Sequence, residues 1–329
     1  MTRLPSALLL LAVAITANAQ QDGCANKIQV SSEADLAPIA SCTTFSGSVT
    51  ISGTTMNAKN WPALQSLTGS IKFASNPLLT TLSLDGLQSS TGSISLFNNT
   101  ALSTINVPNI KSLSNLEIVT APALRQLPLP TIQSIGSLKL EDTGLDNTGA
   151  LPWSNLPKAT DLGVNNNKFL KNLEMPRLTE VSVRFVVAAN GLMEGQQVTN
   201  CTFRHLTDLQ IPQLSQVGAS LAFDETNLQT ILAPKLKAVG QTLSIVSNNW
   251  LMNLTFTELA SIGGALLIAN NTELTNVDGF KQLKDISGVL NMRGAFNNVS
   301  LPTVSTVQGG MSVLSSSKDV ESGQGSGSW

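Results

Sequence analysis

The sequence predicts an all-β protein built as a single right-handed parallel β-solenoid of about twelve coils, each of roughly 22 residues. Three observations lead to this fold class. The motif apolar-x-apolar-x-x-Asn recurs along the chain at one period. Its alternating apolar residues have the spacing of a strand that buries one face. Pro and Gly recur in nearly every copy, and they would break helices of ordinary length.

The repeat is defined by the position that Asn occupies, which we call the slot. Asn fills six slots, and Thr, Ala or Ser fills the other six. The slots lie at residues 54, 76, 99, 121, 143, 167, 190, 226, 248, 271, 295 and 316. Successive slots are 21 to 24 residues apart, except for one interval of 36 residues. This period is typical of leucine-rich and parallel β-helix coils.

The slot Asn residues are interpreted as structural. An amide group can both donate and accept, so each slot Asn is expected to hydrogen-bond the buried corner backbone and the Asn of the neighbouring coil. Thr, Ser or Ala in a slot is expected to leave a gap in this ladder. Ligand binding by the ladder is the less favoured alternative. The predicted ladder residues are Asn76, Asn99, Asn167, Asn190, Asn248 and Asn271.

The N-terminal region is expected to direct secretion and to cap the solenoid. Residues 1–19 have a positive start, a short apolar stretch and an A-x-A site, which together predict a signal peptide. Residues 20–48 precede the repeat and contain Cys24 and Cys42, which should pair in a secreted protein. A redox role for this pair is disfavoured because the spacing is not C-x-x-C.

The remaining chain divides into the repeat and a tail. The repeat solenoid spans residues 49–316, with an insertion near 191–206 that should bulge from one face. This insertion contains Cys201, for which a buried, inert thiol is favoured over an intermolecular bridge. Residues 317–329 are rich in Ser and Gly and are expected to form a flexible tail.

Composition argues against several classes of function. Charged residues make up 12% of the chain and the net charge is -2, so the sequence lacks the basic footprint of a nucleic-acid-binding protein. His205 is the single histidine, which leaves few ways to build a zinc site or a Ser-His-Asp triad. No cofactor, metal site or catalytic residue is therefore predicted.

One class of enzyme needs separate consideration, because a β-helix can cleave polysaccharides with carboxylates gathered on adjacent coils. Glu117 and Glu141 fall on successive coils, but Lys139 lies alongside them, which favours a solvated charged face. The other Asp residues, Asp142 among them, do not stack at one place in the repeat. The chain is thus expected not to be an enzyme, and Glu117 and Asp142 are the residues whose replacement would test this.

Five Asn-x-Ser/Thr sequons predict N-glycosylation of a secreted chain: Asn98, Asn200, Asn253, Asn270 and Asn298. Asn98 and Asn270 directly precede slots and should face solvent, because neighbours on a strand face opposite ways. Asn253 should also point outward, and Asn200 lies in the insertion. Asn298 is expected to be the least accessible, since it lies three residues past its slot, where other coils carry an inward Leu.

The outward positions of the strand before each slot form a candidate interaction face. These positions include Phe97, Val246 and Leu267. An ordinary, mildly apolar sheet face is the favoured interpretation. A lateral contact surface for a partner or a glycan chain is the alternative.

The repeat also resembles a known family. The pattern Pro-x-Leu-x-x-Val-x-Gly-x-Leu-x-Ile-x-x-Asn, the early cysteine pair and the run Arg293-Gly-Ala-Phe-Asn-Asn-Val299 are similar to fungal GPI-anchored cell-wall organisation proteins. These are the cell-wall integrity and sporulation-specific group, with leucine-rich repeats related to receptor L-domains. The resemblance covers roughly residues 20–313. It implies an extracellular, glycosylated, non-catalytic protein of the plasma membrane and cell wall that supports wall integrity, morphogenesis and spore-wall assembly.

The resemblance also frames the expected attachment, partners and function. The family's cysteine-containing C-terminal cap and hydrophobic GPI tail do not occur in the printed residues. Membrane association is thus expected only through a GPI anchor, if the true C-terminus carries its signal. The leading expectation is a secreted scaffold for the cell wall, with wall polysaccharide or wall and membrane proteins as partners. A receptor-like binding module for a glycan or protein is the first alternative, and a carbohydrate-active enzyme is the second.

Overall fold

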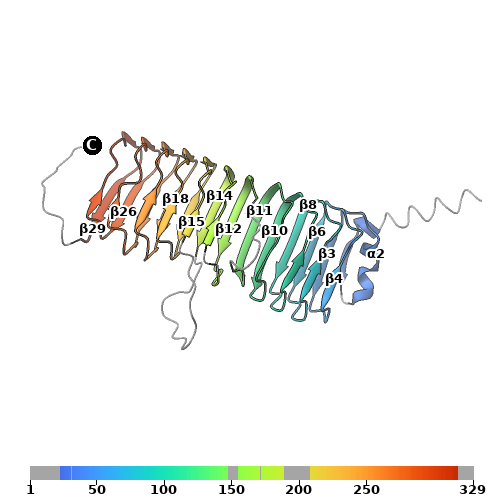
Figure 1. Ribbon diagram of the computed structural model, residues 1–329. Coiled ribbons are helices and arrows are strands. Elements are labelled where there is room, and N and C mark those ends of the chain that lie inside the picture. Colours follow the sequence, from blue (N-terminus) through green and yellow to red (C-terminus); the bar gives the residue numbers. More distant parts are fainter. Residues whose placement is uncertain (1–22, 31, 147–154, 171, 189–207, 318–329) are drawn as a thin grey trace, which may run out of the picture.

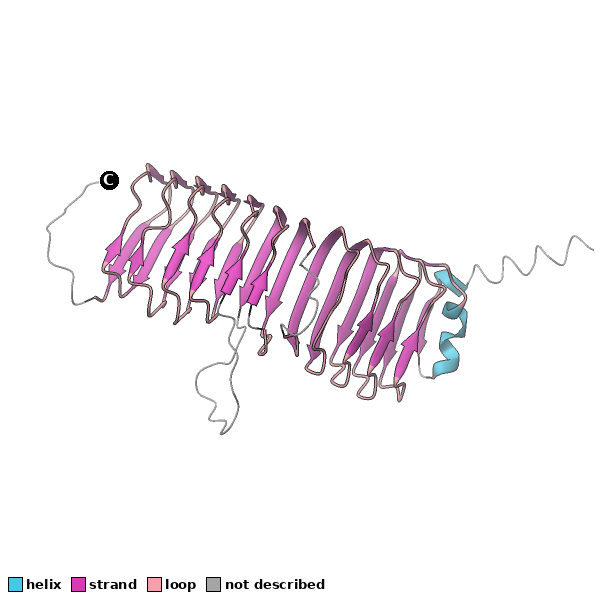
Figure 2. Cartoon of the chain, viewed as in Figure 1, coloured by secondary structure: helices cyan, strands magenta, loops and turns pink. Residues whose placement is uncertain are grey.

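The computed structural model describes residues 23–30, 32–146, 155–170, 172–188 and 208–317. These residues form an elongated stack of parallel strands with little helix (Figure 1, Figure 2). The prediction of an all-β parallel solenoid is therefore confirmed. The predicted signal peptide, the insertion near 191–206 with Cys201, and the tail beyond residue 317 lie outside the described residues.

The strands that precede the slots pair side by side along the whole stack, and we call them the main row. Each strand between the first and the last pairs in parallel with the strand one coil earlier and the strand one coil later. The row consists of β1 (Lys27–Val30), β3 (Ser48–Ser52), β6 (Ser70–Ala74), β8 (Ser89–Phe97), β10 (Ser112–Ala121), β11 (Ser134–Thr143), β12 (Lys158–Asn165), β14 (Glu180–Ala188), β17 (Leu221–Asp224), β20 (Leu243–Val246), β23 (Leu266–Ala269), β26 (Leu290–Gly294) and β29 (Met311–Ser315). At about 4.8 Å per strand, the row is roughly 58 Å long.

A second row of short strands precedes the main row within each coil and belongs to the same sheet. It consists of β2 (Thr44–Phe45), β5 (Ser66–Leu67), β16 (Gln216–Val217), β19 (Ala238–Val239), β22 (Ser261–Ile262), β25 (Asp285–Ile286) and β28 (Thr306–Val307). In the middle of the stack the two rows merge, so that β8, β10, β11, β12 and β14 are longer strands that serve both.

A third row follows the slot corner and closes each coil. It consists of β4 (Ala58–Asn60), β7 (Thr81–Ser83), β9 (Thr104–Asn106), β13 (Asn172–Glu174), β15 (Asp208–Gln210), β18 (Thr230–Leu232), β21 (Asn253–Thr255), β24 (Asn276–Val277) and β27 (Asn298–Val299). The stack continues across the long interval between slots, because β14 pairs directly with β17 and β13 pairs directly with β15. The additional residues of that interval therefore leave the regular coils undisturbed on both sides.

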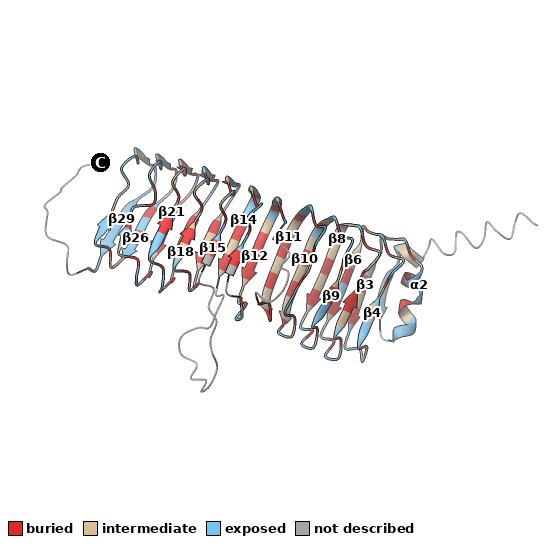
Figure 3. Cartoon of the chain, in the orientation of Figure 1, coloured by how far each residue is buried: buried red, intermediate tan, exposed pale blue. Residues whose placement is uncertain are grey.

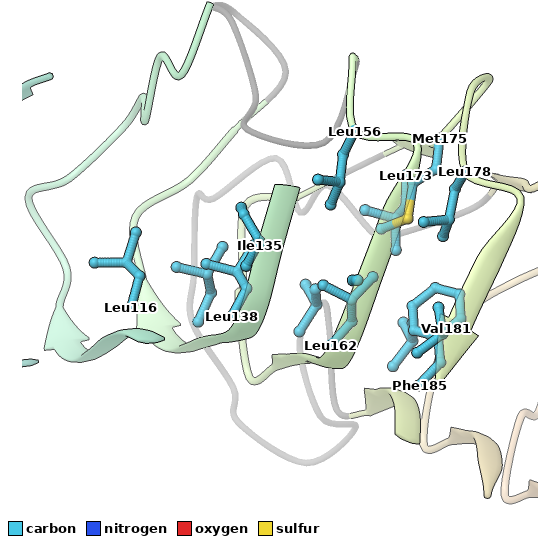
Figure 4. Close-up of a cluster of buried hydrophobic side chains, with 14 of the residues drawn as sticks. Leu116, Ile135, Leu138, Leu156, Leu162, Leu173, Met175, Leu178, Val181 and Phe185 are labelled. Atoms are coloured by element: carbon cyan, nitrogen blue, oxygen red, sulfur yellow. The ribbon is translucent and has the colours of Figure 1, made fainter. Parts of the chain in front are cut away.

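One continuous apolar core fills the inside of these coils, as Figure 4 shows for its middle part. Alternation along the main row explains it: in β6, Ile71 and Phe73 are buried while Lys72 between them is exposed. Each inward side chain lies on its equivalent in the next coil, as with Leu138, Leu162 and Phe185. Burying such a side chain contributes roughly 1.5–3 kcal/mol, so a coil is stable only within the stack.

The N-terminal end of the rod is closed by a small cap. It contains η1 (Gly23–Ala25), β1, η2 (Glu33–Leu36) and α2 (Ala37–Ala40), and β1 begins the main row by pairing with β3. The predicted disulfide is present between Cys24 and Cys42. Leu36 and Ile39 are buried against the first coil, which protects its apolar interior from water.

Replacing both cap cysteines with serine should lower the free energy of unfolding by about 3 kcal/mol, the loop-closure value for this separation of 18 residues. Urea unfolding of the secreted protein would measure the difference. Ser41→Ala, an exposed neighbour of Cys42, is the matched control and should change stability by about 0.5 kcal/mol or less. An equally small effect of the double serine variant would contradict a stabilising role for the bridge.

The other end of the rod is open among the described residues. The strand β29 is largely exposed, with Met311 and Leu314 each 50% accessible, as the pale colour of the last coils shows (Figure 3). A cavity of about 550 Å³ lies there, lined by Leu290, Leu301, Val304, Val307 and Met311. The interior of the last coil is thus accessible at this end.

Candidate functional site

The slot residues form hydrogen-bonded ladders inside the corner. Asn248 accepts a hydrogen bond from the backbone N–H of Thr226 at 2.9 Å, and its amide donates to the carbonyl oxygen of Phe223 at 2.7 Å. The same amide donates to Oδ1 of Asn271 at 3.1 Å in the next coil. All of the described predicted ladder residues are buried and make bonds of this kind: Asn76, Asn99, Asn167, Asn248 and Asn271. Asn190 lies outside the described residues.

The expectation that Thr leaves a gap in the ladder is wrong. Thr54, Thr143 and Thr226 each donate both a backbone N–H and a hydroxyl to the Asn of the following coil. Each described ladder therefore begins with Thr and continues through Asn. The physical reason is that a slot residue donates hydrogen bonds to Oδ1 of an Asn in the following coil, which a Thr hydroxyl can also do. Unlike Asn, Thr does not also donate to a backbone carbonyl of the preceding coil. Among the described slots, a side-chain link is missing at Ala121 and Ala295, and the Ser316 hydroxyl donates to the Gly294 carbonyl oxygen rather than to another slot residue.

Sharp corners separate the main row from the slots. The residue before the slot has a left-handed backbone, with φ between 51° and 64°, at nine described corners. These corner residues are Gly53, Ser75, Asn98, Thr120, Asp142, Asn166, Glu225, Ser247 and Asn270. The left-handed region is unfavourable for most L-residues and least so for Gly, Asn and Asp. The corner turns the chain into the third row and directs its own side chain outward.

The described sequons lie on the corners and on the third row. Asn98 and Asn270 are exposed, and the left-handed corner, rather than simple strand alternation, explains their direction. Asn253 is exposed in β21. Asn298 is exposed as well, because it pairs with Asn276 in the third row and does not occupy the position of an inward Leu. Asn200 lies outside the described residues.

The structure does not gather the predicted interaction residues into one patch. Phe97 and Val246 lie in the same outward line of the main row, but their coils are six strand steps apart, about 29 Å. Leu267 lies one coil beyond Val246, in the adjacent outward line. All three are half-buried, and Lys72 covers the ring of Phe97 at 5.0 Å. The face therefore carries two separate, small apolar areas.

Between these two areas the main row is charged. Lys139 lies between Glu117 and Glu141 and forms ion pairs of 3.2 Å and 3.1 Å with them. Hydrogen bonding to Glu141, and secondarily to Glu117, raises the pKa of Lys139 above its ordinary value. Two carboxylates that share one ammonium group between them are poorly placed for acid–base work on a glycosidic bond. The interpretation of this cluster as a solvated charged face agrees with this geometry.

Other carboxylates are also paired or separate. Asp161 accepts two hydrogen bonds from the guanidinium group of Arg184, at 3.2 Å and 3.1 Å. Asp142 occupies one of the left-handed corners, with φ of 52°, and does not share the strand positions of Glu117 and Glu141. Among the described residues, no three His, Cys, Asp or Glu side chains gather to hold a metal ion.

Sequence reasoning missed one buried acid. Asp146 is 7% exposed and forms an ion pair with Arg125 at 3.2 Å, and Arg125 also lies 4.9 Å from the ring centre of Phe169. These residues belong to three successive coils: Arg125 follows its slot by four positions, Asp146 by three and Phe169 by two. Alignment of successive coils on their slots places these three positions close together, so the contact could have been predicted from the repeat. The group joins coils at the corner and leaves no free carboxylate for chemistry.

Asp224 should make stability depend on pH. Its Oδ1 accepts hydrogen bonds from the Ser244 hydroxyl at 2.8 Å and the Val246 N–H at 3.2 Å. Burial is the largest influence and, with the nearby Glu225, raises the pKa of Asp224 despite these bonds. A raised pKa in the folded state means that the ionised form destabilises the fold. This cost is absent below the unfolded pKa and develops as pH rises through the folded pKa.

Asp224→Asn, which keeps an acceptor oxygen and removes the charge, should therefore raise the melting temperature at pH 7. The difference from the natural protein should shrink toward zero near pH 3. Thermal unfolding measured in steps from pH 3 to pH 8 would test this expectation. A difference that stays constant across that range, or one of opposite sign, would show that burial of this carboxylate does not set the dependence.

Comparisons with known proteins identify the relatives of this fold. Neither a family model nor a solved structure matches the chain. Sporulation-specific protein 2 of Saccharomyces cerevisiae is 31% identical over 64% of this chain and 47% of its own length. A cell surface GPI-anchored protein of Arthroderma benhamiae is 29% identical over 92% of this chain and 78% of its own length. Cell wall mannoprotein PST1 of Saccharomyces cerevisiae is 29% identical over 87% of this chain and 65% of its own length.

The chain thus spans about half the length of the first of these relatives and about two thirds or more of the other two. None of the helices in the described residues is long and apolar enough to span a membrane. The names of these three relatives refer to sporulation, the cell surface and the cell wall. Their similarity to this chain extends over most of the repeat. Over most of its length the chain is thus a homologue, at 29–31% identity, of fungal cell-surface GPI-anchored, cell-wall and sporulation-specific proteins.

Proposed function

We propose that this protein is a secreted glycoprotein of the fungal cell surface that contributes to cell-wall organisation and integrity as a non-catalytic scaffold. The observation that carries the proposal is the unbroken main row from β1 to β29, a stiff rod with one continuous core. The names of its relatives support a location at the cell surface and in the cell wall. Paired carboxylates on the main row support a role without catalysis.

Complementation in a fungal strain that lacks the gene would test the scaffold. The full-length natural protein should restore growth on wall-stressing dyes, and Glu117→Gln combined with Asp142→Asn should restore it equally. These substitutions remove the carboxylates that sequence reasoning singled out for an enzyme while keeping their size. Release of reducing ends from wall glucans by the natural protein, lost in this double variant, would contradict the proposal and favour a carbohydrate-active enzyme.

A receptor-like binding module is the second candidate, and one observation favours it. Each described sequon lies on a corner or on the third row, so glycans there would leave the outward side of the main row uncovered. Serine substitution of Val246 with Leu267, and separately of Phe97, should leave folding intact and abolish binding if that side holds a ligand. Pull-down with wall polysaccharides would detect it, and the absence of any saturable ligand would count against this candidate.

A further inference from the structure

Two large apolar side chains are exposed to solvent beside the sequon at Asn253. Trp250 is 50% exposed and Met252 is 46% exposed, whereas Leu251 between them is buried. They follow the slot of Asn248 in a turn closed by a hydrogen bond from the Leu251 N–H to the Asn248 carbonyl oxygen at 3.1 Å. The turn thus fixes the backbone and directs the two side chains away from the core.

Neighbouring coils do not extend this apolar pair. The N–H of Met252 bonds to the carbonyl of Gln229 in one neighbour, and the N–H of Glu273 in the other bonds to the carbonyl of Asn249. Gln229 and Glu273 are both exposed polar residues. The apolar area is therefore local to one coil, too small for a protein interface of ordinary size and bounded by polar groups.

The adjacent residue carries the sequon. Asn253 is exposed at the start of β21, and the chain from Trp250 to Asn253 spans at most about 11 Å when fully extended. The first sugar of an N-glycan is N-acetylglucosamine, which has an apolar face of C–H groups and an acetyl methyl group. An indole ring offers a large flat surface for such contacts at low conformational cost. The chemistry and the reach of this sugar match the apolar pair.

We propose that Trp250 and Met252 form a seat for the innermost N-acetylglucosamine of a glycan attached to Asn253. The bound sugar covers the apolar pair and holds the glycan against the corner of the rod. This inference rests on glycosylation of Asn253 but not on the scaffold function, so either one can fail without the other.

Two features of the chain supply matched controls. Leu78 occupies the same place after its slot as Trp250 and is also 50% exposed, but Thr81 stands where Asn253 would be. The sequon at Asn298 follows a slot whose coil has Asn297 at the position of Trp250. Leu78→Ser therefore removes an exposed apolar side chain without a glycan, and the Asn298 glycan reports on a site without an aromatic seat.

The test uses the full chain secreted from a fungal host, with site occupancy measured by mass spectrometry. Under native conditions, Trp250→Ser should speed removal of the Asn253 glycan by a peptide N-glycosidase about 2- to 10-fold, the range expected for loss of one aromatic contact. Removal of the Asn298 glycan should keep its rate. Leu78→Ser should leave both rates unchanged.

A double-mutant cycle in thermal unfolding gives an independent measurement. Trp250→Ser should lower the melting temperature by about 1–3 °C when Asn253 is natural, and by nothing measurable when Asn253 is replaced by Gln. An equal loss in both backgrounds, an unchanged rate of glycan removal, or an unoccupied Asn253 would each overturn the proposal.

Discussion

Asn248→Ala is expected to lower the free energy of unfolding by about 3–5 kcal/mol, because each orphaned buried group costs about 1–3 kcal/mol. The substitution removes the acceptor for the Thr226 N–H and the donors to Phe223 and Asn271, all within the buried corner. It also leaves a cavity between two coils that cannot collapse without disturbing the strand pairing. Chemical unfolding followed by circular dichroism would measure the loss.

The neighbouring residue provides the control for this prediction. Asn249 is exposed, and its side-chain oxygen accepts a hydrogen bond from the hydroxyl of Thr272 at 3.1 Å. Asn249→Ala should cost about 1 kcal/mol or less, since water replaces the lost partner. If Asn248→Ala lowered the free energy of unfolding as little as this control, the ladder would result from the stacking of the coils and would not stabilise it.

Gly240→Ala is the second prediction of large effect, with an expected loss of more than about 4 kcal/mol. A Cβ at this position would overlap the backbone carbonyl of Gly218 in the preceding coil, and a Cβ on Gly263 would overlap that of Gly240. Backbone atoms cannot move aside as side chains do, so the coils would have to separate. The yield of secreted protein and its melting temperature should both fall sharply.

Gly163→Ala tests whether this effect is specific to the stacked glycines. The nearest atom that its Cβ would meet is Nδ2 of Asn165 at 3.7 Å, an ordinary van der Waals distance. The variant should be secreted normally and lose about 1 kcal/mol or less. A comparable loss of stability in both variants would mean that any glycine of these coils is needed, whatever its surroundings.

The repeat could be predicted from sequence because each inward position and each slot recurs at the same place in every coil. The residue types themselves determine the bonds in two cases, because Asn amides can both donate and accept and cysteines can form a disulfide. The ladder and the cap bridge were therefore predictable from residue type and spacing. The same alignment predicted that Lys139 lies beside Glu117. These features depend only on which residues share a coil position, which the period fixes.

Features that depend on corner shape were not predictable in this way. Asn298 reaches the third row three residues after its slot, whereas Asn276 reaches it after five, so its exposure depends on a shorter corner. The donating role of Thr226 depends on the direction in which adjacent corners face. The need for Gly240 arises from the approach of two backbones, which residue type alone does not reveal.

The slots filled by Ala have a consequence for the order in which the rod comes apart. At Ala121 the missing amide is offset by the long strands β10 and β11, which pair along almost their full length. At Ala295 the flanking strands β26 and β29 are short, and most residues of β29 are exposed to solvent. Within the described residues, heat or denaturant should therefore separate β29 and β26 first, and the pairing of β10 with β11 should persist longest.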